Sequence, residues 1–467
     1  MSAAIDTSDL EAQVDRLNAE LGLPGLAVGI WHGGEEQYVY RGVTSVRNPL
    51  PVDQDTLFQF GSTGKTMTAS AIMRLVERGL VDLEAPVRRY VPELRLGDEL
   101  VARDVTVLHL LNHTAGWEGD MVDYTGEGDD ALERYVALMS RLHQVSPLGT
   151  IVSYNNAALS LAGRVIEKVT GVTYETAMRE LLLDPLGLHD TLFSMNDIML
   201  RRFVVGHHQR ADGRIDQATT WAVPRGRRPA GGMSATARDQ IAWARFHLCG
   251  GLTPDGTRVL SAETIRRMQQ PTASMPGSGL GDHVGISWLL RDVDGVRLVA
   301  HGGTTIGQHS DFVIVPDRDF AVVVLTNCGP NGNQFKNQFT DWALGEYLGL
   351  AQADPSLSLR PDDELTRYAG RYQTIVAMND VRASEGRLVM TQGARPDRAD
   401  TLRRAGEDPE ARQEFVLAMV EGAGDRFVVV EGATKGASGY FSRDAGRRVD
   451  GLHFGGRLAK RVGGAAA

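Results

Sequence analysis

Strand-like segments stand at both ends of a long stretch whose middle is helical, and this arrangement constrains the fold more than any other feature of the sequence. A hairpin is predicted over residues 25–31 and 37–40, after a helix at 10–21. Strand patterns return only at residues 284–290, 296–300, 312–315 and 320–326, before a last helix at 334–348. Helical patterns fill the interval, at residues 61–79, 106–113, 130–143, 156–169, 173–184, 236–248 and 261–269. We therefore expect one sheet assembled from distant pieces, an α+β fold with a helical insertion.

A second, smaller domain is expected after this unit, because 467 residues exceed the usual domain size of about 100–200 residues. Residues 351–363 are polar, contain two prolines and have no period, which is typical of a linker. Short period-2 stretches separated by Gly and Asp turns follow, and they favour a small antiparallel barrel. The predicted division is a domain at 1–350, a linker at 351–363 and a β-barrel domain at 364–467.

Charge and apolar patterning exclude several classes of partner. The formal charge is −10 and the chain has no basic face or tail, so nucleic acid is not an expected partner. Cys249 and Cys328 have no metal-ligand spacing, and the longest apolar run, Phe320 to Leu325, is too short for a membrane span. The stretch from Met1 to Asp15 has no signal-peptide pattern. We expect a soluble, cytoplasmic protein without a metal.

Lysine is rare in this chain, with five residues among 49 basic ones, so a lysine inside an apolar helix is informative. Ser62-Thr63-Gly64-Lys65 stands at a predicted helix start, where positions i and i+3 share a face. The helix dipole and burial both disfavour an ammonium there, so Lys65 could take the proton of Ser62. This is the chemistry of an S-x-x-K motif. The alternative is a capping serine beside an exposed lysine.

Two further patterns could complete a site. Tyr154-Asn155-Asn156 precedes a predicted helix and contains Y-x-N, in which a tyrosine can relay protons and an asparagine amide can orient its neighbours. The alternative is an interface tyrosine followed by a capping asparagine. His301-Gly302-Gly303 ends a predicted strand, where glycines allow close backbone approach. The same letters at His32-Gly33-Gly34 show how unspecific this third pattern is alone.

The order of the three motifs resembles the serine acyl-transfer family that includes class C β-lactamases, penicillin-recognising DD-peptidases, D-aminopeptidases and related esterases. The resemblance covers roughly residues 8–349, with similar segments at 108–116, 147–149 and 229–234. It implies a β-lactamase/transpeptidase-like catalytic domain, with an antiparallel sheet flanked by helices and a helical subdomain. The segment 364–467 resembles the lipocalin-like domain appended to some of these hydrolases. That domain could cover the site, restrict substrate size, form a homo-oligomer, or only stabilise the chain.

The resemblance also implies roles for individual residues. Ser62 would form an acyl-enzyme, Lys65 would activate it, and Tyr154 would pass protons to the leaving group. Asn156 would orient Lys65 and a substrate amide. The remaining implied members are His301, the oxyanion-hole N–H groups of Ser62 and Thr304, and the substrate-binding Gly302 and Gly303. No cofactor is implied, and the partner would be a small-molecule or peptide substrate with an ester, amide or thioester bond.

One residue departs from the pattern of this family and narrows the range of expected substrates. His301 stands where β-lactamases and DD-peptidases carry a lysine that helps to hold a carboxylate, and a histidine near pH 7 is mostly neutral. Efficient β-lactamase action is therefore not expected. The pattern favours hydrolysis of an ester or amide, with a D-residue beside the bond. The alternatives are a penicillin-binding-type thioesterase that cyclises a nonribosomal peptide and a non-catalytic sensor that is acylated once.

Two clusters of basic residues outside the three motifs can each be explained without a functional role. His109 and His113 have the i, i+4 spacing of metal ligands, but helix packing explains them. Arg225, Arg227 and Arg228 could meet a substrate carboxylate or a carrier phosphate, or they could lie in a solvated loop.

Overall fold

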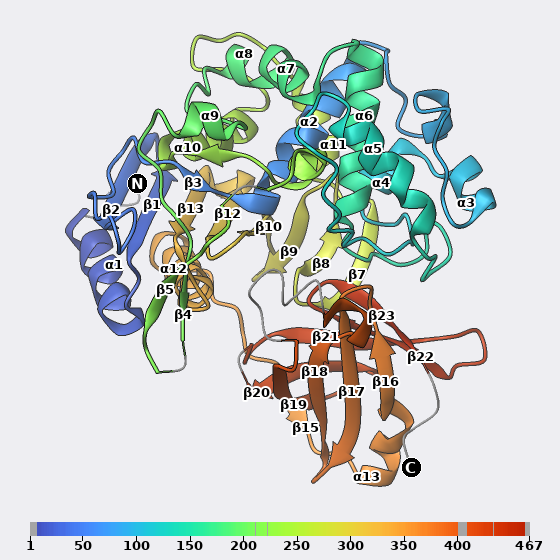
Figure 1. Cartoon of the computed structure of the whole chain (residues 1–467). Coiled ribbons are helices and arrows are strands. Elements are labelled where there is room, and N and C mark those ends of the chain that lie inside the picture. The colour runs from blue at the N-terminus through green and yellow to red at the C-terminus, as the bar shows by residue number, and fades with distance from the viewer. Residues whose placement is uncertain (1–6, 211, 222, 400–408, 433, 463–467) are drawn as a thin grey trace.

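The chain forms a larger mixed part and a smaller barrel. The computed structural model describes residues 7–210, 212–221, 223–399, 409–432 and 434–462. Figure 1 shows the barrel, coloured orange to red, below the rest of the chain. Within the described ranges, no helix is both long and apolar enough to cross a membrane.

The larger part is built on one antiparallel sheet whose strands come from both ends of residues 25–326. Its order is β2-β1-β13-β12-β10-β9-β8-β7, with β11 paired to β12. The strands are β1 (Gly25–His32), β2 (Glu35–Gly42), β7 (Ala273–Ser278), β8 (Gly281–Val284), β9 (Leu289–Val293), β10 (Val296–Ala300), β11 (Gly303–Thr304), β12 (His309–Val315) and β13 (Phe320–Thr326). The N-terminal hairpin thus pairs through β1 with β13, the last long strand, as the sequence predicts.

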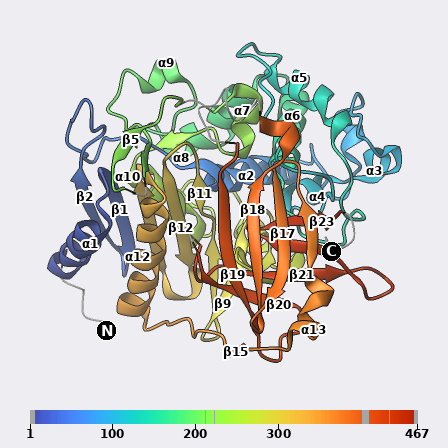
Figure 2. The same cartoon turned by 60° about the horizontal axis from the view of Figure 1, so that its bottom comes forward.

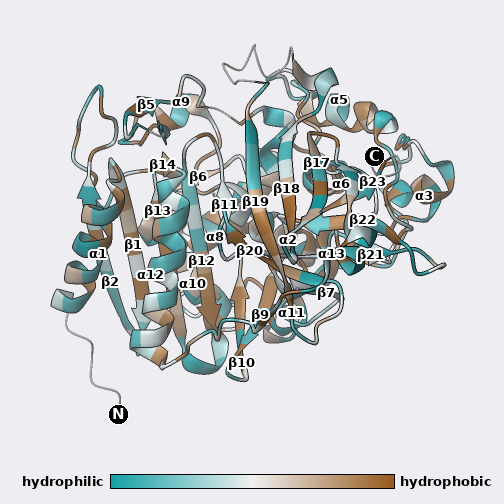
Figure 3. Ribbon diagram, turned by 90° about the horizontal axis from the view of Figure 1, so that it is seen from below, coloured by the Kyte–Doolittle hydropathy of each residue, from teal (hydrophilic) through white to brown (hydrophobic). Residues whose placement is uncertain are grey.

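Helices cover both faces of this sheet. On one face α1 (Thr7–Leu21) and α12 (Asn331–Leu348) pack on alternate residues of β1 and β13, such as Val28 and Val324. On the other face α10 (Ala237–Leu248) packs on the intervening residues, such as Ala27 and Val323. Both central strands are apolar at nearly every position because neither face meets water. Figure 3 shows α1 and α12 over the strands.

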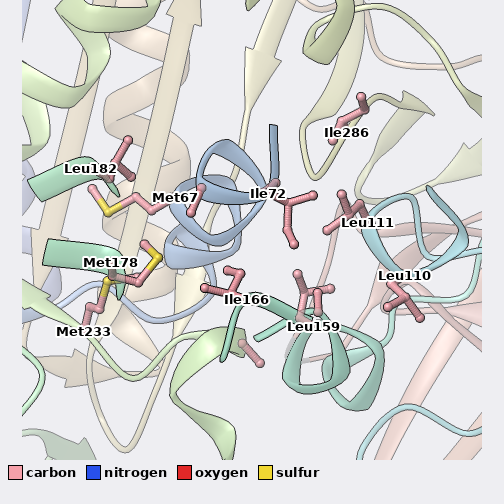
Figure 4. Close-up of a cluster of buried hydrophobic side chains, with 14 of the residues drawn as sticks. Met67, Ile72, Leu110, Leu111, Leu159, Ile166, Met178, Leu182, Met233 and Ile286 are labelled. Carbon is pink, nitrogen blue, oxygen red and sulfur yellow. The ribbon is translucent and has the colours of Figure 1, made fainter. Parts of the chain in front are cut away.

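The remaining helices form the predicted helical insertion. They are α2 (Gly64–Glu77), α3 (Glu99–Asp104), α4 (Val107–Leu111), α5 (Ala131–Leu138), α6 (Asn156–Thr170), α7 (Tyr174–Met178), α8 (Asp184–Leu186), α9 (Met195–Ile198) and α11 (Ala262–Met268). Helix α2 is buried along almost its whole length and forms the centre of this layer. Figure 4 shows Met67 and Ile72 of α2 among side chains from α4 and α6, including Leu111, Leu159 and Ile166.

Short elements connect these layers. They are β3 (Phe58–Gln59), β4 (His207–Gln209), β5 (Ile215–Gln217), β6 (Ser234–Ala235), β14 (Cys328–Gly329), and the 3-10 turns η1 (Gly61–Thr63) and η5 (Arg225–Ala230). β3 pairs with β6, which places the segment before η1 beside the segment after η5.

The C-terminal part is a closed barrel of eight antiparallel strands in which each strand pairs with its sequence neighbours and β23 closes onto β16. The strands are β16 (Gly370–Gln373), β17 (Ala377–Ser384), β18 (Arg387–Ala394), β19 (Arg412–Val420), β20 (Arg426–Glu431), β21 (Ser438–Arg443), β22 (Val449–Phe454) and β23 (Arg457–Arg461). Figure 2 shows the strands of the barrel from the side. This confirms the expected barrel and fits the lipocalin-like resemblance.

The exact domain boundaries stay predictions. Within the predicted linker, β15 (Leu357–Ser358) pairs with β19, and α13 (Asp362–Leu365) follows. The predicted strand at residues 284–290 is only partly right, because residues 285–288 form a turn between β8, which ends at Val284, and β9, which begins at Leu289. Ser287 there has φ +58°, and its N–H and hydroxyl both donate to Leu111 O. The apolar residues of this turn are buried because they dock on the helical layer, so periodicity alone could not separate turn from strand.

Candidate active site

Ser62 and Lys65 meet at the start of α2, as the S-x-x-K spacing predicts. Ser62 lies in η1 and is half-buried, whereas Lys65 lies in the first turn of α2 and is fully buried. Lys65 Nζ lies 2.9 Å from Ser62 Oγ and also donates to Ala230 O at the end of η5. The alternative of an exposed lysine is therefore wrong.

The surroundings of Lys65 favour its neutral amine. Burial lowers the pKa of Lys65 well below its usual value, and the positive charges of Arg457 and Arg227 lower it further against the opposing charge of Asp120. The N-terminus of α2 adds a positive dipole end. A neutral amine beside a serine hydroxyl can act as a general base.

Tyr154 lies in the same cluster. Lys65 Nζ is 4.8 Å from the centre of the Tyr154 ring, and the Tyr154 hydroxyl hydrogen-bonds Ser62. Burial raises the pKa of Tyr154 above its usual value, while the hydrogen bond with Ser62 opposes the increase. The phenol therefore remains protonated near neutral pH and has a proton to donate.

His301 faces Tyr154 from the end of β10. Its Nδ1 lies 2.7 Å from Gly302 O and its Nε2 lies 3.4 Å from the Tyr154 hydroxyl. Burial lowers the pKa of His301 to about 3, with Lys65 also lowering it and the bond to Gly302 opposing. His301 is thus neutral near pH 7, with the proton on Nδ1 and Nε2 free to accept the hydroxyl hydrogen of Tyr154.

Close backbone contacts join η1 to β11. A Cβ at Gly303 would lie 2.0 Å from Phe60 O, so this position accepts only glycine if β11 is to reach the nucleophile segment. A Cβ at Gly61, where φ is +54°, would lie 3.0 Å from Thr304 N. The backbone of η1 therefore lies close to that of β11, and the role of the Ser62 and Thr304 N–H groups as an oxyanion hole stays a prediction.

A chain of buried hydroxyls fixes this junction. Thr63 Oγ1 donates to His301 O and contacts Ser310 Oγ, which donates to Phe60 O. At Gly302 the nearest atom to an added Cβ would be Lys336 Nζ, the mobile end of a lysine side chain, at 3.0 Å, so packing alone does not require a glycine there. The role of Gly302 and Gly303 in substrate binding stays a prediction.

Asn156 is held by a carboxylate that sequence reasoning missed. Its Nδ2 donates to Asp120 Oδ1 at 2.6 Å, whereas the hydrogen bonds of Lys65 go to Ser62 and Ala230. The role of Asn156 in orienting Lys65 stays a prediction. Burial raises the pKa of Asp120, but Arg457 and the hydrogen bonds to the carboxylate outweigh it, so the pKa is lowered and Asp120 is ionised.

Arg457 enters the site from the barrel and was also missed. Its Nε and Nη2 donate to Asp120 at 3.1 and 3.4 Å, and its guanidinium lies 4.6 Å from the centre of the Tyr154 ring. The turn before β23 also binds the backbone around the tyrosine. Tyr154 N–H donates to Gly456 O, and Leu458 N–H donates to Ser153 Oγ. The barrel therefore forms one wall of the site.

The ring of His113 packs against that of Tyr154, with ring centres 4.4 Å apart. Its Nδ1 accepts the N–H of Asn155, which caps α6, and its backbone has φ +61°. His109 Nδ1 accepts the N–H of Thr106 at the start of α4. In the ranges that the structure describes, no group of His, Cys, Asp and Glu side chains could hold a metal ion.

Comparisons with known proteins show the family and the fold of this chain. A model of the beta-lactamase family matches residues 10–345. Penicillin-binding protein 4 of Amycolatopsis lactamdurans is 33% identical over 374 residues, which cover 79% of this chain and 98% of that protein. Esterase EstB of Burkholderia gladioli is 33% identical over 226 residues, which cover 44% of this chain and 56% of the esterase. The crystal structure of SurE with D-Leu has a TM-score of 0.74 at 24% identity, covering 98% of this chain and 99% of SurE.

Proposed function

This chain belongs to the beta-lactamase family of serine hydrolases, and from that premise we propose that it cleaves an ester or amide bond through an acyl-enzyme on Ser62. The observation that carries the proposal is the 2.9 Å approach of a fully buried Lys65 Nζ to Ser62 Oγ. A buried lysine with a lowered pKa is a base matched to a serine nucleophile.

The first step is acylation. The Lys65 amine takes the proton of Ser62 while Oγ attacks the substrate carbonyl carbon, and the carbonyl oxygen becomes an oxyanion. The N–H groups of Ser62 and Thr304 stabilise this oxyanion. Collapse of the intermediate breaks the bond to the leaving group, which takes a proton from the Tyr154 hydroxyl.

Reprotonation and deacylation follow through the same residues. The proton that Lys65 took then passes to the phenolate of Tyr154, whose ring centre lies 4.8 Å from Lys65 Nζ. Water then attacks the acyl carbon while the neutral Lys65 amine accepts its proton, and Ser62 Oγ leaves and takes that proton back from the Lys65 ammonium. Neutral His301 holds the Tyr154 hydroxyl by accepting its hydrogen bond, so it contributes position and not charge.

The substrate class is the finer part of the proposal. The neutral His301 removes the cation that would attract a β-lactam carboxylate at this motif, which favours peptidase or esterase chemistry over β-lactamase action. Esterase EstB supports an ester substrate, and the SurE structure with D-Leu supports a D-residue beside the bond.

A fluorophosphonate probe followed by peptide mass spectrometry tests the first step. The expected result is one labelled peptide containing Ser62, with labelling abolished in Ser62→Ala and unchanged in Ser140→Ala, an exposed serine. Labelling at another residue, or equal labelling of Ser62→Ala, would overturn the proposal.

Three candidate functions share the acylation of Ser62 and differ in what then happens to the acyl group. Transfer to water gives a hydrolase, and transfer to the amine of a bound peptide gives a cyclase. A peptidyl thioester ending in a D-residue distinguishes them, because mass spectrometry resolves the linear acid from the cyclic product. A burst of p-nitrophenol with no steady rate would instead mark a sensor that is acylated once.

A further inference from the structure

Most cations near Ser62 are already engaged. Lys65 is held by Ser62 and Ala230, and His301 is neutral. Arg457 directs Nε and Nη2 to Asp120 and Nη1 to Gly455 O, so each of its nitrogens has an acceptor. None of these groups is available to a substrate anion.

Two of the three arginines in η5 are also engaged. Arg225 donates to both oxygens of Glu175 at 3.1 Å and pairs with Asp129. Arg228 donates to Glu175 at 2.6 Å and to Glu127 at 3.3 Å. Burial raises the pKa of Glu175, but its hydrogen bonds with Arg225 and Arg228 outweigh it, so the pKa is lowered and the cluster is an ionised clamp that fixes η5.

Arg227 differs from both neighbours. Its side chain has no ion pair and no hydrogen bond among the residues that the structure describes, and its Nε is buried. Partial burial of an unpaired guanidinium is costly, because such groups are normally paired or hydrogen-bonded. The two terminal nitrogens of Arg227 are not among the buried unpaired atoms, so they are open to a ligand.

The placement of η5 brings this guanidinium to the active site. Ala230, at the end of the same turn, accepts the hydrogen bond of Lys65. A Cβ at Gly226 would lie 2.5 Å from Thr125 Oγ1 and 3.1 Å from the Cβ of Tyr135, so η5 rests on the loop that carries Asp120. The charge of Arg227 is close enough to act on both Lys65 and Asp120.

We propose that Arg227 binds a carboxylate of the substrate beside Ser62. The inference rests on the proposed function, because it names a recognition element of the same site. Arg225, Arg228, Arg457 and Asp120 are already paired, whereas Arg227 carries a positive charge with no ion-pair partner among the described residues. A substrate carboxylate would pair with this charge and matches the planar fork of a guanidinium, which can donate two parallel hydrogen bonds.

This assignment supplies a carboxylate-binding cation that the third motif lacks, because His301 stands there in place of a lysine. A substrate carboxylate would be held on the side of η5 and not beside His301. The carboxylate could belong to the acyl portion or to the leaving group, and the experiment separates the two sources.

Acylation of Ser62 by matched ester pairs, followed by intact-protein mass spectrometry, tests the inference. The acyl-side pair is the p-nitrophenyl monoester of adipic acid and its adipamate analogue. The leaving-group pair is the butyrate ester of 3-hydroxybenzoate and that of 3-hydroxybenzamide. In each pair the carboxylate is replaced by a neutral carboxamide of similar shape.

We expect the unaltered protein to be acylated faster by the carboxylate member of one pair, and the pair showing it identifies the source. In Arg227→Gln, the efficiency of acylation by the carboxylate ester should fall about tenfold or more, because a charge-assisted hydrogen bond is lost. The efficiency of acylation by the matching carboxamide ester should change less than about threefold. Arg227→Lys should retain part of the preference. Arg267→Gln, at an exposed position of α11, should behave as the unaltered protein.

The other outcomes are decisive against the inference. Equal acylation within both pairs, or a preference that survives in Arg227→Gln, overturns it and leaves the serine hydrolase proposal intact. Equal losses on carboxylate and carboxamide esters in Arg227→Gln show a structural role and also overturn it. If none of the four esters acylates Ser62, the proposed function fails and the subsite with it.

Discussion

The guanidinium of Arg457 lies 4.6 Å from the centre of the Tyr154 ring, although Arg457 begins the last strand of the barrel and Tyr154 precedes a helix of the larger part. The same guanidinium binds Asp120, which in turn binds Asn156. Two parts of the chain that look separable in Figure 1 therefore share one electrostatic network around the nucleophile.

This network predicts opposite pH shifts for two substitutions. Neutral Lys65 is the active form, so kcat/KM falls as pH drops through its pKa. Arg457→Met removes a positive charge, which raises that pKa and moves the acid limb to higher pH by several tenths of a unit to about one unit. Asp120→Asn removes a negative charge and moves it to lower pH. Shifts of the same sign, in pH profiles of ester hydrolysis, would contradict the assignment of Lys65 as base.

Loss of the Lys65 amine should remove most of the catalysis. Lys65→Met is expected to lower kcat about 10²- to 10⁴-fold in steady-state ester hydrolysis, because a positioned general base contributes on that scale. Lys168→Met is the matched control, since Lys168 lies at the surface and pairs with Glu93. Comparable losses in both variants would indicate general destabilisation.

The approach of β11 to the nucleophile predicts a strict glycine. Gly303→Ala would place a Cβ against Phe60 O, so we expect a loss of about 1–3 kcal/mol in the free energy of unfolding, together with slower acylation of Ser62. The control Gly345→Ala lies at an exposed position inside α12 and should stabilise the chain by about 0.5–1 kcal/mol. Urea unfolding of both variants measures the difference. A harmless Gly303→Ala would mean that this contact is not tight.

Acid should destabilise the protein through buried histidines. His247 lies between Trp243 and Trp288, and burial lowers its pKa from 6.5 to about 3. The unfolded chain therefore binds a proton that the folded chain does not between these pH values, so stability is full above about pH 6.5 and falls as pH decreases toward 3. His247 alone should account for about 2 kcal/mol at pH 5.

Urea midpoints at pH 7.5 and pH 5 measure this effect. His247→Leu should show a smaller decrease between the two pH values than the unaltered protein, whatever its stability at pH 7.5. His208→Gln, at an exposed position, should keep the full decrease. An unchanged pH dependence in His247→Leu would show that other groups carry the acid sensitivity.

The sequence by itself determined what short-range spacing can express. The i, i+3 relation placed Ser62 beside Lys65 because a helix start brings these positions to one face, and short apolar runs marked the strands that now pair as β1 with β13. The barrel was also foreseeable, from short strands at regular intervals. The turn at residues 285–288 was not, because its side chains Ile286 and Trp288 are buried against the helical layer and are as apolar as those of a strand.

Only the tertiary structure decided the charge balance of the site. Asp120, Arg227 and Arg457 stand in no local pattern with Ser62, and they meet because η5, the loop before α5 and the barrel turn converge on one point. Ion pairing separates Arg227 from Arg225 and Arg228, which sequence could only group together. The pKa of Lys65 depends on burial and on charges from distant segments, and both arise only when the chain has folded.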